Sequence, residues 1–315
     1  MLNKLLNKFN YINIGIYFIL LSMMCYIIRD TIVKMFITIP PVEVVFFSSI
    51  FGLIITVVSL YLKPIIMLQK KPKKFKLLLF RGVSGFIAST TFFYNITHIS
   101  LVGTVVFMQT SVIFSAILMS LLFSEKLTLL QWISIFVGFI GIILMVSPNG
   151  QLQITKLDFI GLFCGISSAS AYISIRELRG CYESRIIVLS FLCVSAISSS
   201  ICMLFAEFLY QPYLDFIVTK FVMPDFKILF LLLFIALFST LGQLYKTKAY
   251  FNHKTAVIGI FGYLRIPIAF IIGLLLGDKF PELFIILGMI LIILSCVMVS
   301  YTKYQKTTQD SYQFK

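Results

Sequence analysis

Ten long apolar segments constrain the fold of this chain more than any other feature. Each can cross a hydrocarbon core of about 30 Å as a helix that rises about 1.5 Å per residue. Helices satisfy every backbone N–H and C=O group within the segment, and the alternating strands typical of a β-barrel are absent. We therefore predict an all-α, polytopic membrane protein whose ten transmembrane helices lie at residues 11–33, 41–62, 77–97, 101–123, 131–148, 158–176, 186–209, 227–245, 255–276 and 283–301.

Charged residues are scarce and concentrate in the connectors between the apolar segments. Only 12% of the 315 residues are charged, whereas a soluble domain carries about 25%. With the N-terminus inside, 18 Lys and Arg residues fall on the inner side, 5 on the outer side and 3 in or at the edges of segments. This asymmetry follows the positive-inside rule and predicts a bacterial inner-membrane protein with both termini cytoplasmic. It also explains the net charge of +14 without nucleic acid as a partner.

The apolar segments also form an internal repeat. Residues 77–147 can be laid on residues 230–300 without gaps, so that the turn Ser124-Glu125-Lys126 falls on Gly277-Asp278-Lys279. Because each half holds five helices, an odd number, the halves must have opposite orientations, as in many secondary transporters. We predict an inverted 5+5 repeat with halves at 1–148 and 149–301 and a polar cytoplasmic tail at 302–315.

Eight short motifs are spread along nearly the whole chain. They are Arg81-Gly82, Phe93-Tyr94-Asn95, Gly103-Thr104, residues 121–127 (LLFSEKL), Gln131-Trp132, residues 137–141 (VGFIG), residues 263–267 (YLRIP) and residues 275–278 (LLGD). In these motifs the chain resembles the EamA-type proteins of the drug/metabolite transporter superfamily. The resemblance implies a ten-helix carrier of small metabolites.

Three further strings narrow the resemblance to one subgroup. Residues 30–34 (DTIVK), 43–47 (EVVFF) and 263–265 (YLR) are similar to S-adenosylmethionine uptake transporters. That subgroup commonly follows the second string with Arg, where this chain has Ser48. The resemblance implies uptake of S-adenosylmethionine or a similar amphoteric metabolite. Export of amino acids or other metabolites, which also occurs in the superfamily, is the alternative.

Arg265 is the clearest candidate for a substrate-binding residue, because it falls near the middle of an apolar segment. A charge there costs about 2.5–3.5 kcal/mol on insertion scales, so such groups usually mark a substrate or ion pathway. Tyr263 lies two positions earlier, and Pro267 removes a helical N–H and can kink the helix. We expect Arg265 to bind an anionic group of the substrate, with Tyr263 nearby. The alternative is an arginine held by a carbonyl or carboxylate for packing alone.

Asp30 is the second candidate, and we expect it to meet a cationic group of the substrate. Arg29 stands beside it, but adjacent side chains on a helix point about 100° apart, so the two need not contact each other. Lys34 is four residues further on and could instead form a local pair with Asp30. The alternative for Asp30 is an ordinary charged cap on the first helix.

Three more polar residues are candidate substrate contacts, each with an alternative role. Arg81 lies in the first turns of its segment, where it could be a topological charge. Gln109 lies near the middle of the fourth segment, where such groups also bond between helices. Tyr94 lies at the outer end of the third segment, where tyrosines belong to interfacial belts. Lys246 and Lys248 are interpreted as topological charges at the inner end of the eighth segment.

Enzyme motifs are absent from the sequence, which contains no HExxH, P-loop or G-x-S-x-G string. With only His98 and His253, a histidine metal site is not expected, and no cofactor or catalytic residue is assigned. A membrane-embedded transferase and a selective channel are the opposing classes. We predict a non-enzymatic secondary transporter whose partners are the lipid bilayer, a small-molecule substrate, and either a coupling proton or an antiported metabolite.

Overall fold

Helices make up nearly all of the part of the chain that the computed structural model describes, namely residues 2–62, 74–123, 128–145, 154–209, 214–252, 262, 264–295 and 297–298. No strand occurs among these residues. The helices are α1 (Leu2–Phe36), α2 (Pro41–Leu62), α3 (Phe75–His98), α4 (Leu101–Gln109), α5 (Ser111–Phe123), α6 (Leu129–Met145), α7 (Lys156–Leu178), α8 (Ser184–Leu209), α9 (Phe226–Asn252), α11 (Arg265–Leu275) and a last helix at Leu283–Ser295.

The all-α membrane architecture predicted from the sequence is confirmed. Within the described residues, seven helices are long and apolar enough to cross a membrane, and α4 and α5 together count as one of them. Three shorter apolar helices, at Leu129–Leu144, Arg265–Leu275 and Leu283–Ser295, overlap the other predicted segments. The chain is therefore a multi-pass membrane protein.

Two of the helix boundaries that differ from the sequence prediction concern the site. Helix α9 continues to Asn252, seven residues beyond the predicted end at 245, so Lys246 and Lys248 lie within a helix and not in a connector. Helix α11 begins at Arg265, which the sequence had placed near the middle of a longer helix. Pro267 is thus in the first turn of α11, where a missing N–H leaves no hydrogen bond unmade. Residues 255–261 and 263 of the predicted segment lie outside the described residues, so the kink expected at Pro267 stays a prediction.

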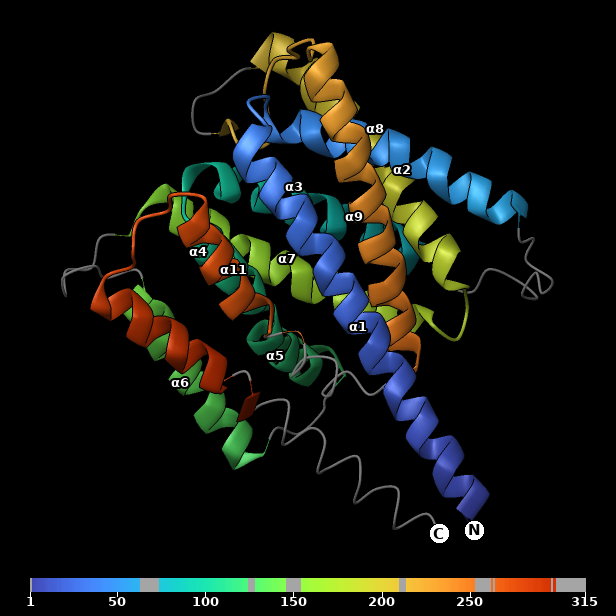
Figure 1. Cartoon of the computed structure of the whole chain (residues 1–315), viewed down its shortest axis with the longest axis vertical. Coiled ribbons are helices and arrows are strands. Elements are labelled where there is room, and N and C mark those ends of the chain that lie inside the picture. The colour runs from blue at the N-terminus through green and yellow to red at the C-terminus, as the bar shows by residue number, and fades with distance from the viewer. Residues whose placement is uncertain are drawn as a thin grey trace.

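The helices form a central group with two flanks (Figure 1). The central group consists of α1, α3, α4, α7, α9 and α11. Helix α1 runs alongside α9, and α3 packs against α7. On one flank, α2 packs against α8, and both contact this central group. On the other flank, α6 lies beside the last helix (Figure 1), where Ser295 donates a hydrogen bond to the Ser134 carbonyl. The central group surrounds the polar site described below.

Polar side chains tie the helix ends together on the side where α1 ends. Lys34 donates to the Ile99 carbonyl at 2.7 Å and forms an ion pair with Asp278 at 3.2 Å. Asp278 in turn accepts the Leu101 N–H at the start of α4 at 2.7 Å. The local Asp30–Lys34 pair considered from the sequence is therefore not the contact that Lys34 makes. These bonds connect α1, α4 and the turn after α11.

Small residues allow α6 and the last helix to approach closely. A Cβ atom added at Gly141 would lie 2.8 Å from the Gly288 carbonyl oxygen and 3.0 Å from the Ile292 nitrogen. Both are backbone atoms, which cannot move aside as a flexible side chain can. Close packing of this kind replaces the hydrophobic driving force that membrane helices lack.

We expect Gly141→Ala to lower the melting temperature of the purified protein in detergent. Overpacking costs about 1–3 kcal/mol, more than the roughly 1 kcal/mol that alanine gains over glycine in helix propensity. Gly180→Ala is the matched control, because a Cβ there has nothing within 4 Å. Equal melting temperatures for the two variants would contradict the close α6 contact.

Candidate functional site

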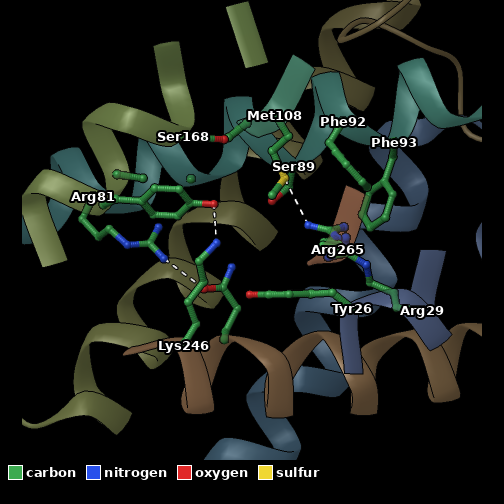
Figure 2. Close-up of a pocket in the computed structure, with 15 residues that line it drawn as sticks. Tyr26, Arg29, Arg81, Ser89, Phe92, Phe93, Met108, Ser168, Lys246 and Arg265 are labelled. Carbon is green, nitrogen blue, oxygen red and sulfur yellow. Dashed lines mark hydrogen bonds between the residues drawn. The ribbon is translucent and has the colours of Figure 1, made fainter. Parts of the chain in front are cut away.

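A polar cavity lies in the middle of the central group of helices. It has a volume of about 50 Å³. Four helices each place one cationic side chain in its wall: α1 contributes Arg29, α3 Arg81, α9 Lys246 and α11 Arg265. Figure 2 shows Arg81 and Lys246 on one side of this cavity. Arg29 and Arg265 lie on the other side, and the Tyr26 side chain reaches between the two pairs.

Asp30 holds two of these cations in place. Arg29 donates through Nε and Nη2 to Asp30 Oδ1 at 2.9 and 2.6 Å. Arg265 donates through Nη2 to the other carboxylate oxygen, Oδ2. The three side chains are almost fully buried, with Asp30 1% and Arg265 3% exposed. The adjacent pair Arg29–Asp30 therefore is in contact, because the long guanidinium side chain bridges the angle between the two positions.

Aromatic rings surround the same two arginines. The Arg29 guanidinium lies 4.7 Å from the Tyr26 ring centroid, and Arg265 lies 5.3 Å from the same ring. Phe92 is 5.2 Å from Arg29 and 5.3 Å from Arg265. Contacts of this geometry stabilise a cation that has left water. They leave the cations charged and directed toward the cavity.

Arg81 occupies the opposite side with few hydrogen bonds. It is 1% exposed, its Nη2 donates to Gln243 Oε1 at 3.3 Å, and its guanidinium lies 4.9 Å from the Phe191 ring. Its Nε and Nη1 have no hydrogen-bond partner among the described residues. A Cβ at Gly85 would lie 2.2 Å from Arg81 Nη1, so this glycine makes room for the guanidinium.

Lys246 lies next to Arg81 in the cavity wall. Its ammonium donates to the Tyr172 hydroxyl and lies 3.9 Å from the Tyr172 ring centroid. The Tyr26 ring is 5.5 Å away on another side. The sequence had assigned Lys246 to the inner connector as a topological charge. The structure corrects this assignment, because the extension of α9 brings the side chain into the bundle, where it is 9% exposed.

A second cavity of about 40 Å³ adjoins the first and shares with it Tyr26, Met108, Tyr172, Lys246 and Arg265. Gln109 and Gly262 line this part. Gln109 is the last residue of α4, and the chain turns at Thr110 before α5 begins. The break in the helix thus falls at the cavity, close to the first turn of α11.

The structure brings four of the six predicted site residues together and separates one. Arg265 and Arg81 line the main cavity, and Gln109 lines its extension. Asp30 contacts Arg265 from behind the cavity wall. Tyr94 is elsewhere: its hydroxyl donates to Asp215 at 2.9 Å and its ring stacks on His98. Tyr263 lies outside the described residues.

Sequence reasoning did not assign Arg29, Lys246, Tyr26 or Tyr172 to the site. One signal for Lys246 was present, because the segment after Lys248 continues with Ala249, Tyr250 and Phe251. Both tyrosines sit in apolar stretches where nothing local distinguishes a cavity wall from a packing interface. Within the described residues, no group of three or more His, Cys, Asp or Glu side chains could hold a metal ion.

Comparisons with known proteins agree on one family. Residues 13–147 match the model of the EamA-like transporter family. An uncharacterized transporter of Helicobacter pylori (strain ATCC 700392 / 26695) is 33% identical over 292 residues, which cover 92% of this chain and 96% of that protein. The pseudopaline exporter CntI of Pseudomonas aeruginosa (strain UCBPP-PA14) is 25% identical over 266 residues, 84% of this chain and 88% of the exporter.

Two further matches, one curated protein and one solved structure, also extend over most of this chain. Solute carrier family 35 member G1 of Homo sapiens is 22% identical and matches 94% of this chain and 81% of that protein. A solved crystal structure superimposes with a TM-score of 0.59 at 13% identity, covering 94% of this chain and 98% of the other. The helical fold is therefore shared over almost the whole length.

We expect Asp30→Asn to destabilise the folded protein strongly. The substitution leaves Arg29 and Arg265 buried beside each other without a carboxylate, and breaking a buried ion pair costs about 3–5 kcal/mol. Thermal melting in detergent measures the effect, with Glu282→Gln, at an exposed carboxylate, as the control. Adding Arg29→Met to Asp30→Asn should recover part of the loss, since one unpaired cation is removed. Additive effects of the two substitutions would contradict the shared ion pair.

Proposed function

The chain belongs to the EamA-like transporter family, and from that premise we propose that it is a secondary transporter for a small metabolite that carries a carboxylate. One observation carries the proposal: four cations from four helices converge on a buried cavity, and among the described residues one carboxylate, Asp30, compensates them from behind the cavity wall. A buried cavity with several aimed donors suits an anionic solute, since charge-assisted hydrogen bonds are the strong ones.

Arg265 is the proposed centre of substrate binding. It stands at the start of α11, where the positive end of the helix dipole adds to its own charge. Its Nε has no hydrogen-bond partner among the described residues, and its Nη1 contacts only the weak acceptor Met108 Sδ, at 3.5 Å. Two of its nitrogens therefore have hydrogen-bonding capacity left for a substrate carboxylate.

An S-adenosylmethionine-like amphoteric metabolite stays the first named substrate to test. Its carboxylate would bind Arg265, as the resemblance to the uptake subgroup implies. Asp30 was expected to bind the cationic part, but both of its oxygens already accept from guanidinium groups. A cationic group must therefore use the Tyr26 or Tyr172 ring, in competition with Lys246. This arrangement favours substrates with more negative than positive charge, and it disfavours S-adenosylmethionine itself, which carries two positive charges (sulfonium and ammonium) and one negative charge.

Export is the second candidate function, and one comparison favours it. The pseudopaline exporter, although 25% identical, matches 84% of this chain. Uptake and export use the same cavity in an alternating-access carrier, and the direction depends on the gradient and the coupled ion or metabolite. Movement of labelled solute into right-side-out and inside-out vesicles, with and without a proton gradient, distinguishes the two directions.

The inverted 5+5 repeat, with halves at 1–148 and 149–301, is supported by how the helices pair. If α1, α2 and α3 correspond to α7, α8 and α9, each contact should have a counterpart. The pair α1–α9 then matches α7–α3, and α2–α9 matches α8–α3. All four contacts are present. The cavity lies where the two proposed halves meet, as expected for a carrier with alternating access.

The carrier proposal excludes chemical conversion of the solute. In sealed proteoliposomes, mass spectrometry should recover the transported molecule unmodified from the vesicle interior. Conversion of the solute without movement of the intact molecule would favour the membrane-embedded transferase and overturn the carrier.

We expect both termini to be cytoplasmic in a bacterial inner membrane. Reporter fusions after Ser124 and after Arg179 should report the cytoplasmic side, and a fusion after Gly150 the outer side, because 18 of the cationic residues fall on the predicted inner side and 5 on the outer. A cytoplasmic signal from the fusion after Gly150 would contradict this ten-helix topology.

We expect Arg265→Ala to abolish or greatly weaken transport per inserted molecule. Arg265→Lys keeps the charge but loses the planar fork that binds a carboxylate through two hydrogen bonds, so it should raise the apparent substrate constant. The measurement is uptake in proteoliposomes, normalised to correctly inserted protein, together with melting in the presence and absence of solute.

The control is Gly180→Ala, in the turn after α7 and far from any neighbouring atom. Wild-type transport per molecule in Arg265→Ala would remove Arg265 from the site. Loss of insertion in both Arg265 variants, without any change in transport per inserted molecule, would assign Arg265 a packing role.

A further inference from the structure

The charge of the cavity exceeds what one carboxylate of a substrate would neutralise. Guanidinium groups stay protonated in proteins, so Arg29, Arg81 and Arg265 contribute +3 and Asp30 contributes −1, a sum of +2. This sum counts only the guanidinium groups and Asp30, and a protonated Lys246 raises it to +3. An excess of +2 in a low-dielectric site is costly until a ligand compensates it.

The excess charge is divided between two places. Asp30 compensates only the Arg29–Arg265 side, where it contacts both guanidinium groups. On the other side, Arg81 bonds to a neutral amide, Gln243, and Lys246 bonds to a neutral hydroxyl, Tyr172. No carboxylate among the described residues contacts Arg81 or Lys246. Figure 2 shows the two pairs facing each other across the cavity.

Arg81 has the features of a side chain prepared for a ligand. It is 1% exposed, and two of its three nitrogen atoms, Nε and Nη1, have no partner among the described residues. Leaving a buried charged donor unpaired is costly, so such a group usually has a partner in the working protein. Arg81 Nη1 lies against the Cα of Gly85, where the Cβ of any other residue would displace the guanidinium group.

We propose that Arg81 and Lys246 form a second anion-binding subsite, and that the transported solute carries two negatively charged groups, one for each side of the cavity. The inference rests on the proposed transporter function and specifies its substrate class as a dianion such as an aliphatic dicarboxylate. One carboxylate lies against Arg265, the other against Arg81, and the connecting carbons pack on the Tyr26 ring. Two negative charges offset the guanidinium excess of +2, and Lys246 adds a further donor on the Arg81 side.

The test compares diacids with their own mono-amides, which have the same length and shape but one charge fewer. The full-length protein in phosphatidylcholine nanodiscs is melted with succinate, glutarate, adipate or suberate, and with the mono-amide of each, at constant ionic strength. At the best-fitting length, we expect the diacid to reach half-maximal stabilisation at a concentration about tenfold lower than its mono-amide, as for one added charge-assisted contact.

Three variants locate the second charge. Arg81→Gln should bring the ratio between mono-amide and diacid close to one. Gly85→Ala should lower the same ratio without changing any charge, because its Cβ displaces Arg81 Nη1. Gly180→Ala is the matched Gly-to-Ala control and should keep the wild-type ratio, since a Cβ there meets no atom within 4 Å.

A ratio near one at every chain length in the wild-type protein would overturn the second subsite, and so would a ratio that Arg81→Gln does not change. Absence of stabilisation by the whole series would overturn it as well. The transporter proposal is decided separately, by whether intact solute moves across a sealed membrane. A transporter that moves monocarboxylates without preference for diacids would therefore retain the first proposal and lose this one.

Discussion

The Asp30 carboxylate, shared by two arginines inside an apolar bundle, is the interaction on which the central site depends. It joins α1 to the first turn of α11, and it keeps Arg29 and Arg265 close together despite their like charge. All three side chains are buried, so the carboxylate must supply the compensation that solvent supplies at an exposed site. Because one carboxylate cannot neutralise two guanidinium groups, the same interaction leaves this side of the cavity positive.

The aromatic residues allow that positive charge to persist in the absence of a ligand. Tyr26 lies within 5.5 Å of three cations, and Tyr172 contacts Lys246 through both its ring and its hydroxyl. Ring faces attract cations without removing their charge, whereas carboxylates at the same positions would cancel it. A cavity lined in this way stays folded when empty and stays attractive to anions. The aromatic rings therefore stabilise the buried cations and also leave their charge available to an anionic substrate.

The sequence was sufficient to predict the helical membrane fold, because apolar length alone determines which segments can cross a bilayer. It also singled out Arg265, Asp30 and Arg81, since a charge inside an apolar segment needs a partner or a function. The structure brings these three residues to the cavity or its wall, and their role in substrate binding stays a prediction. It did not show that Arg29 and Asp30 contact each other, because that depends on the reach of the Arg29 side chain. It misplaced Lys246, because hydropathy treats a lysine as the end of a helix whether it faces water or a cavity. Tyr94 was grouped with the site by its motif, but its neighbours at the end of α3 are Asp215 and His98.

Ion pairs connect α1 to both ends of α11, and they limit how these two helices can move relative to each other. Near the cavity, the acidic Asp30 of α1 pairs with the basic Arg265 of α11. Beyond the other end of α11, the basic Lys34 of α1 pairs with the acidic Asp278 of the turn that follows α11. Because the polarity reverses between the two contacts, sliding one helix along the other would bring like charges together. We therefore expect α1 and α11 to move as one unit although they belong to different halves of the proposed repeat. The cavity would then open by movement of that unit relative to α3 and α9, which carries Arg265 away from Arg81 and Lys246.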